Sequence, residues 1–234
     1  MAKKTWLQLS QDLRREAGVQ GDGPTAVTSQ TGMYNNLVNW INQAKVDTES
    51  LHDNWKFMHG NYQITPTTTA TRDYTLTSVP KRIEPHSIIA TNSDGLIHEV
   101  TFLEWSLFQE KYRTHVVSAD QVPRVVTLTP EGVLRFLDYT TAGYTIDFEY
   151  VKRPTKMTAS GDTMNIPEEY ELIVVFKALM DYGLFYSAQE AVQHGQARYM
   201  DYLIRLREDQ LIRPTVKLGS FLHESRNTGV SRFL

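Results

Sequence analysis

Near its C-terminal end the chain reads PEEYELIVVFKALM, from Pro167 to Met180. Proline suits the first turn of a helix, and Glu168 and Glu169 place negative charge where the helix dipole favours it. Residues 172–176 and 178–180 are apolar on all sides of a helix axis, so this helix must be covered from more than one direction. It is therefore either central in the fold or in contact with a neighbouring chain. The residues expected to form such an inter-subunit face are Leu172, Val175, Phe176 and Leu179.

Three further segments have the periodicity of amphipathic helices. Residues 5–17 place Trp6, Leu9 and Leu13 at helical spacing, and glycines with a proline end the pattern at 18–24. A second apolar stripe runs from about residue 31 to residue 55, and a last one from about 188 to 211. Each end of the chain therefore supplies two helices, which we expect to form one bundle.

Between residues 62 and 153 the sequence is rich in Thr, Val, Ile and Tyr and is interrupted by prolines and glycines, which is typical of short strands. Asp94-Gly95 is a hairpin signal. A helical interruption at 102–112 is expected to cover one face of the sheet. The expected strands are 72–76, 87–91, 97–100, 124–129, 133–138 and 145–151.

These patterns predict an α+β fold, in which a helical bundle carries an inserted, mainly antiparallel β domain and an extended C-terminal arm. We expect the N-terminal helices of the bundle in 1–60 and the β-rich insertion in 61–155. The C-terminal helices are expected in 156–212 and the arm in 213–234.

The last 21 residues, from Pro214 to Leu234, have no periodicity and a basic bias. Fully extended, they would reach roughly 65 Å at about 3.3 Å per residue, which is enough to touch another subunit. A frayed terminus is the alternative. Phe233 and Leu234 favour a docking arm, because a tail without a partner is usually depleted in such residues.

Composition excludes several classes of protein. The chain has 234 residues, no cysteine and a net charge of −3, so it has neither disulfides nor the basic field of a protein that grips nucleic acid. Contact with DNA without affinity remains possible. No run of about 18 apolar residues occurs and the first residues do not resemble a signal peptide, so we expect a soluble, unprocessed protein.

The sequence contains none of the common signatures of enzymes. A Walker loop, a nucleophile elbow and a dinucleotide fingerprint are all missing. His98-Glu99 and His223-Glu224 begin like zinc-protease motifs but lack the second histidine. We therefore expect no catalytic residue, metal or cofactor. Two carboxylates distant in sequence could still converge in a cleft, which leaves a small cell-wall hydrolase as an alternative.

Both flanks of the chain resemble head-to-tail adaptor proteins of tailed bacteriophages. At the N-terminal end the similarity lies in LSQDLRREAG (9–18), GDGPT (21–25), LVNWINQA (37–44) and Trp55-Lys56-Phe57. At the C-terminal end it lies in IPEEY (166–170), ALMDY (178–182) and ARY (197–199). These are packing patterns, and the β-rich middle carries no motif of this kind.

The resemblance implies a virion protein of the neck, made in the host cytoplasm, that docks on the portal as a ring, typically of twelve identical copies. Such a ring would continue the DNA channel, let the genome pass without sequence-specific binding, and offer a platform to a tail or neck protein, with no role for a membrane. Another ring protein, such as a tail terminator or a tube connector, is the alternative. By position, the arm residues expected to contact the portal are Phe221, Leu222, Arg226, Arg232, Phe233 and Leu234.

Overall fold

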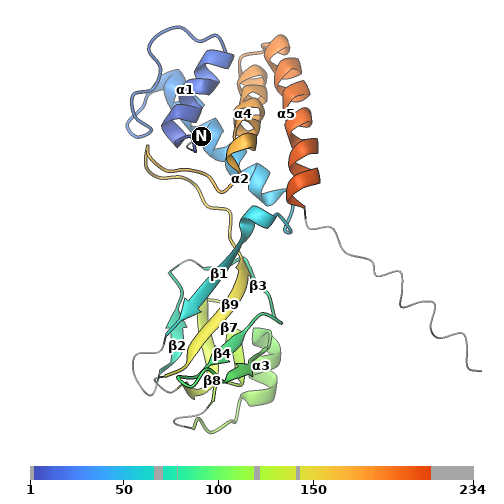
Figure 1. The fold of residues 1–234 in the computed structure, drawn as a ribbon. Coiled ribbons are helices and arrows are strands. Elements are labelled where there is room, and N and C mark those ends of the chain that lie inside the picture. Colours follow the sequence, from blue (N-terminus) through green and yellow to red (C-terminus); the bar gives the residue numbers. More distant parts are fainter. Residues whose placement is uncertain (1–2, 66–70, 78, 119–121, 141–142, 212–234) are drawn as a thin grey trace, which may run out of the picture.

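The computed structural model describes residues 3–65, 71–77, 79–118, 122–140 and 143–211, and it consists of a helical part and a β part joined end to end (Figure 1). The helical part contains α1 (Trp6–Glu16), α2 (Gly32–Ser50), α4 (Leu172–Phe185) and α5 (Gln189–Gln210). The predicted α+β class is confirmed, with helices from both ends of the chain packed together and the strands between them in sequence.

Helix α4 is the central element of the helical part, in contact with α1, α2 and α5 (Figure 1). Val175, Phe176 and Leu179 are all buried in the core of their own chain, while Leu172 is only partly buried. The apolar character of α4 is therefore explained by its central position, which is one of the two alternatives that the sequence left open. Three of the four side chains of the predicted inter-subunit face are thus covered within the protomer, and contact of this face with a neighbouring chain stays a prediction.

Helices α1 and α5 match the sequence pattern closely. Helix α1 begins with a capping box, in which Thr5 and Gln8 exchange hydrogen bonds between side chain and backbone. Helix α5 lies within the stripe predicted from about 188 to 211 and buries Gly195, Leu203 and Leu206. The predicted start of the fourth helix at Pro167 is a 3₁₀ turn over Glu168–Tyr170, and α4 follows it.

Helix α2 ends at Ser50, five residues before the predicted end at Trp55. The chain leaves the helix there because Trp55 turns into the core: its side chain is fully buried, its indole N–H donates to the Thr48 carbonyl at 3.3 Å, and its ring stacks on Phe57. Trp55 therefore continues the apolar spacing of the helix because its side chain is buried, although its backbone is no longer helical.

The β part consists of two sheets and one short helix, α3 (Trp105–Tyr112). One sheet has the order β1-β9-β4-β5 with β3 also paired to β9, and the other has the order β2-β8-β7-β6. All pairs are antiparallel except β6 with β7. The strands are β1 (His59–Ile64), β2 (Thr71–Thr75), β3 (Arg82–Ile83), β4 (Ile89–Thr91), β5 (Ile97–Glu99), β6 (Thr101–Phe102), β7 (Val125–Leu128), β8 (Val133–Thr140) and β9 (Thr145–Val151).

The two sheets enclose one apolar core, separate from the core of the helices. Strands β5 and β6 are separated by Val100 alone and belong to different sheets, so this stretch of chain joins the sheets on one side of the core. Gly95 adopts φ +81 in the turn between β4 and β5, which confirms the predicted hairpin. The β-part core is built from Ile64, Leu76, Ile83, Ile88, Ala90, Val100, Val126, Leu134, Phe136, Ile146 and Phe148.

The chain passes between the two parts twice. It leaves the helices through residues 51–58 and returns through 152–166, and β1 and β9 lie side by side at this junction with His59 opposite Val151 (Figure 1). Lys152 N donates to the Met58 carbonyl at 2.7 Å. Trp55, Met58 and Val151 belong to the helical core, so this core extends onto the ends of both strands.

Candidate functional site

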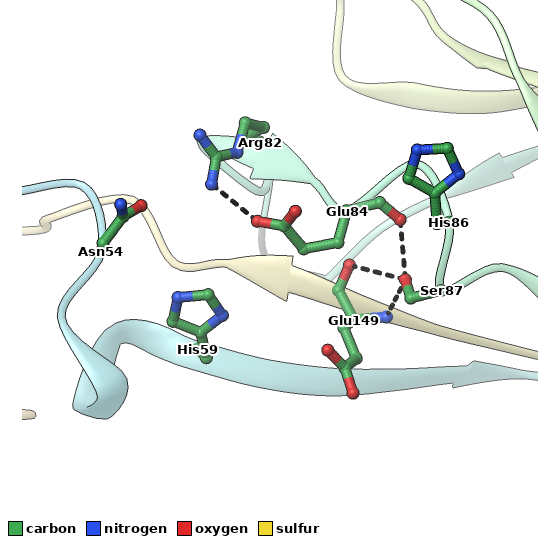
Figure 2. Close-up of a pocket in the computed structure, with 7 residues that line it drawn as sticks. All are labelled: Asn54, His59, Arg82, Glu84, His86, Ser87 and Glu149. Carbon is green, nitrogen blue, oxygen red and sulfur yellow. Dashed lines mark hydrogen bonds and ion pairs between the residues drawn. The ribbon is translucent and has the colours of Figure 1, made fainter. Parts of the chain in front are cut away.

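A hollow near the junction has a volume of about 590 Å³ and is lined by polar side chains (Figure 2). Ser87 Oγ donates to the Glu84 carbonyl at 2.7 Å and accepts from Glu149 N at 2.8 Å, which ties the segment before β4 to β9. No hydrogen bond joins Ser87 to either histidine drawn in Figure 2, His59 or His86. Ser87 Oγ thus bonds to backbone groups. A nucleophilic serine would instead be hydrogen-bonded to a base.

Metal chemistry has no support in the described ranges. They contain no cluster of three or more His, Cys, Asp or Glu side chains that could hold a metal ion. His98 and Glu99 lie in strand β5, where His98 packs near the Tyr144 ring. Glu99 is paired in register with Ile89. His223-Glu224 lies outside the described residues.

Four aromatic rings, from α2, from α4 and from the residue that follows α4, gather at the end of α4 that lies farthest from the β part (Figure 1). Trp40 of α2 makes edge contacts with Tyr182, Phe185 and Tyr186, with ring centroids 5.6 to 6.4 Å apart. Phe185 is nevertheless 63% exposed and the adjacent Leu184 69% exposed. We call Trp40, Tyr182, Leu184, Phe185 and Tyr186 the aromatic end. Exposed aromatic clusters of this kind are typical of protein interfaces.

The turn after the aromatic end is tightly built. Ser187 adopts φ +55, a left-handed conformation that is uncommon outside glycine. Ala188 N donates to the Gly183 carbonyl at 2.8 Å, and a Cβ on Gly183 would lie 2.6 Å from Val192 Cγ2. Helices α4 and α5 therefore approach closely directly after the aromatic end.

A second apolar surface lies on the outer side of α5. Met200 and Ile204 are one helical turn apart and are 45% and 52% exposed, whereas Leu203 and Leu206 point into the core. Helix α5 thus has an apolar outer stripe in addition to its buried face.

A polar stripe on α2 fastens the returning segment of chain to the helices. Asn42 donates to the Met157 carbonyl and accepts from Met157 N, both at 2.9 Å. One turn later, Lys45 donates to Glu49 at 3.0 Å and to the Thr155 carbonyl. These three residues, Asn42, Lys45 and Glu49, form what we call the α2 clamp. It fixes residues 155–165 relative to the bundle.

The end of α5 lies against the outgoing segment of chain. His52 accepts a hydrogen bond from Arg207 Nε at 3.1 Å, so its Nε2 carries no proton in this arrangement. Partial burial lowers the pKa of His52, the nearby charge of Arg207 lowers it further, and Asp53 opposes both. Asp53 itself pairs with Lys81 from the β part.

The aromatic end, the α2 clamp and the contacts at the end of α5 were not predicted from the sequence. The sequence holds a signal for the first two of these: the run Leu184-Phe185-Tyr186 at the end of a helix, and the spacing of Asn42, Lys45 and Glu49 at i, i+3 and i+7 within an apolar pattern. The six predicted portal contacts lie outside the described residues. They are Phe221, Leu222, Arg226, Arg232, Phe233 and Leu234.

A sequence model of the SU10 adaptor protein family matches residues 4–217, which includes both helical flanks and the whole β part. The chain belongs to the SU10 adaptor protein family. This confirms the resemblance to phage head-to-tail adaptors, and it extends the similarity to the β-rich middle, in which the sequence showed no motif. No curated protein matches the chain.

Membership of this adaptor family makes the protein a structural component of a phage virion, in a family of adaptors and not of enzymes. The family match ends at residue 217, so it does not reach the six predicted portal contacts. Within the described part of the adaptor, no helix has both the length and the apolar character needed to cross a membrane.

Proposed function

We propose that the protein is the head-to-tail adaptor that docks on the portal of its phage, forms a ring of twelve copies and continues the DNA channel toward the tail. The observation that carries this proposal is the family match over residues 4–217, which spans both parts of the structure. The tail or neck protein below would bind the free face of the ring.

Ring formation is supported by the surface of the helical part. A closed ring needs a head-to-tail contact, in which two different patches of the same chain meet. The helical part has two such apolar patches on different elements, the aromatic end of α4 and the Met200–Ile204 stripe of α5. In the ring, each subunit would cover the patch of its neighbour. Leu172, the partly exposed member of the predicted helix face, would add to this contact.

The charge of the chain suits a channel for DNA. Its net charge of −3 gives no strong attraction for phosphate, and attraction of that kind would retard the passing genome. The channel would thus guide DNA by shape and by weak repulsion, without reading its sequence.

The C-terminal arm would supply the attachment to the portal. Residues 213–234 contain four Arg or Lys residues against one Glu, together with the apolar anchors Phe221, Leu222, Phe233 and Leu234. Ordering such a segment on a partner costs conformational entropy, and a ring that engages many arms at once offsets this cost through multivalency. An acidic portal surface with apolar pockets would be complementary to the arm.

The test is to mix purified adaptor with portal rings of the same phage and to follow binding by sedimentation and electron microscopy. We expect the full chain to add a ring to the portal, and a chain lacking residues 221–234 to remain unbound with its melting temperature nearly unchanged. A matched control replaces two apolar residues of the same segment that are not among the predicted contacts, Val216→Ser with Leu218→Ser, and should still bind. If the full chain does not join competent portal rings, the proposed function is wrong.

A further inference from the structure

The last residues of α5 are tied to the segment through which the chain leaves the helices. Leu211 pairs with Trp55 in an isolated antiparallel bridge. Lys56 Nζ donates to the Asp209 carbonyl at 2.7 Å, and Arg207 Nε donates to His52 Nε2 at 3.1 Å. We call these three contacts the junction latch.

The outgoing segment is held equally firmly on its other side by the β part. Lys81 pairs with Asp53, and Lys81 N donates to the Val151 carbonyl at 2.9 Å. Strand β1 begins at His59, immediately after the 3₁₀ turn that contains Lys56, and is paired with β9 along its whole length. A displacement of residues 52–56 therefore moves β1, and β1 moves the sheet to which it belongs.

The returning segment leaves little freedom for the β part to move independently of this latch. The α2 clamp fixes the chain from Thr155 onward through Lys45, and again at Met157 through Asn42. Only residues 152–154 separate that clamp from the end of β9. The orientation of the β part on the helices is consequently set at two places, one clamped to α2 and the other held by the end of α5.

The latch also lies where the C-terminal arm begins. Leu211 is both the bridge partner of Trp55 and the last described residue before residues 212–234. Beside it is a shallow depression of about 450 Å³, lined by Leu51, His52, Asp53, Asn54 and Leu211. Any load or reorientation of the arm therefore acts first on a residue that contacts the junction.

We propose that the junction latch couples the C-terminal arm to the orientation of the β part, so that capture of the arm by a partner repositions the β part on the bundle. This inference rests on the proposed function, because it takes the portal as the partner that captures the arm. A coupling of this kind needs an element with two arrangements that the partner stabilises differently. The latch would be that element, because it is held by two polar contacts and one bridge. Of its residues, Trp55 belongs to the apolar core of the helices and Leu211 packs against that core.

Distance measurement between two spin labels on the full chain tests the latch. The native chain has no cysteine, so Ser93→Cys in the β4–β5 turn and Gln196→Cys on the exposed side of α5 give two unique labelling sites. The latch variant combines Lys56→Met with Arg207→Met, which keeps the aliphatic stems. Its matched control combines Lys111→Met with Arg205→Met. Lys111 is an exposed residue of α3, and Arg205 is an exposed residue of α5, the helix that also carries Arg207.

We expect a narrow distance distribution for the parent and the control, and at least a twofold broader one for the latch variant in the free protein. Equal widths in the latch variant and the parent would overturn the latch. With portal rings added, the mean distance should shift in the parent and should no longer respond in the latch variant; identical shifts in both would overturn the coupling. If the adaptor does not bind portal rings at all, the proposed function is contradicted. The latch is still tested in that case, because its comparison uses the free protein.

Discussion

Lys45 and Glu49 form an ion pair inside the helical core, with Lys45 Nζ 3.0 Å from Glu49 Oε2 and side chains only 3% and 0% exposed. Each partner also holds the returning segment. Lys45 donates to the Thr155 carbonyl, and Glu49 Oε1 accepts from the backbone and side-chain nitrogens of Asn165. The pair thus fastens the segment that connects β9 to α4 at two places, Thr155 and Asn165.

Removal of one partner of this pair should be costly. Glu49→Leu leaves the Lys45 ammonium buried without its counter-charge, and we expect the free energy of unfolding to fall by about 3–5 kcal/mol. The double variant Lys45→Met with Glu49→Leu should recover part of the loss, because it buries no charge. Urea unfolding followed by tryptophan fluorescence measures both effects.

A second pair with the same i, i+4 spacing provides the control. Lys177 and Asp181 on α4 are 3.9 Å apart and partly exposed, and Lys177→Met should cost no more than about 0.5 kcal/mol. If Glu49→Leu proved as mild as Lys177→Met, the α2 clamp would not fix the returning segment as inferred.

Glu171 should make stability depend on pH in the direction opposite to that of an ordinary surface carboxylate. Its side chain is buried, Oε2 accepts from Lys4 N at 2.9 Å, and Oε1 has no partner within the described residues. Burial raises the pKa of Glu171 above its usual value of 4.5, although the Lys4 hydrogen bond and the charge of Lys3 oppose the shift. The folded protein therefore binds this proton more tightly than the unfolded chain does.

It follows that ionised Glu171 costs stability above its folded pKa, and that this cost disappears as the pH falls from the folded pKa toward 4.5. Glu171→Gln keeps an acceptor for Lys4 N and removes the charge, so it should be more stable than the parent at pH 7. The difference should shrink as the pH is lowered. Thermal unfolding over a pH series checks the trend, with Glu169→Gln on the exposed side of the same turn as a variant that should show no such gain.

Much of the fold was predictable because it depends on local pattern. The buried side of α5 and the alternation of Ile146 and Phe148 in β9 both follow directly from periodicity. Strand β1 could not be found in this way, since it contains Gly60 and Asn61, which strands disfavour. It forms because β9 pairs with it residue by residue, and Gly60 fits there because a Cβ would lie 3.2 Å from the Tyr150 ring.

The α2 clamp could not be predicted from the sequence either, but for a different reason. Asn42 and Met157 are 115 residues apart, and nothing in either local pattern indicates that one satisfies the backbone of the other. The apolar surface of α4 posed a similar problem, since periodicity shows that a helix face is apolar but not whether the same chain or a neighbouring one covers it. The end of α4 that does remain exposed, at Leu184 and Phe185, lies beyond the stretch that drew attention in the sequence.

Close packing of α4 against α5 depends on Gly195. A Cβ at this position would lie 2.9 Å from the Phe176 carbonyl oxygen and 3.2 Å from Met180 N, both backbone atoms of α4. We expect Gly195→Ala to lower the free energy of unfolding by about 1–3 kcal/mol, because the two helices must move apart. This would outweigh the gain of up to about 1 kcal/mol that alanine brings to a helix.

Gly161→Ala serves as the control for that substitution, since a Cβ there has no heavy atom within 4 Å. Its stability should be unchanged or slightly raised. Equal behaviour of the two alanine variants in urea unfolding would mean that α4 and α5 are not packed as closely as the Gly195 geometry requires.

The aromatic end should be needed for assembly and dispensable for folding. Leu184 and Phe185 are 69% and 63% exposed, so Leu184→Ser with Phe185→Ser should change the free energy of unfolding by only about 0.5 kcal/mol. In a ring that uses this end as one half of its head-to-tail contact, the same change removes a central apolar anchor from every interface, and complete rings on the portal should be lost.

The matched control, Leu96→Ser with Ile97→Ser, removes two side chains of similar exposure from the β part. Native mass spectrometry of portal mixtures should show a full complement of copies for the control and incomplete sets for the aromatic-end variant. The reverse result would place the ring contact on the β part and would contradict assembly through the helices.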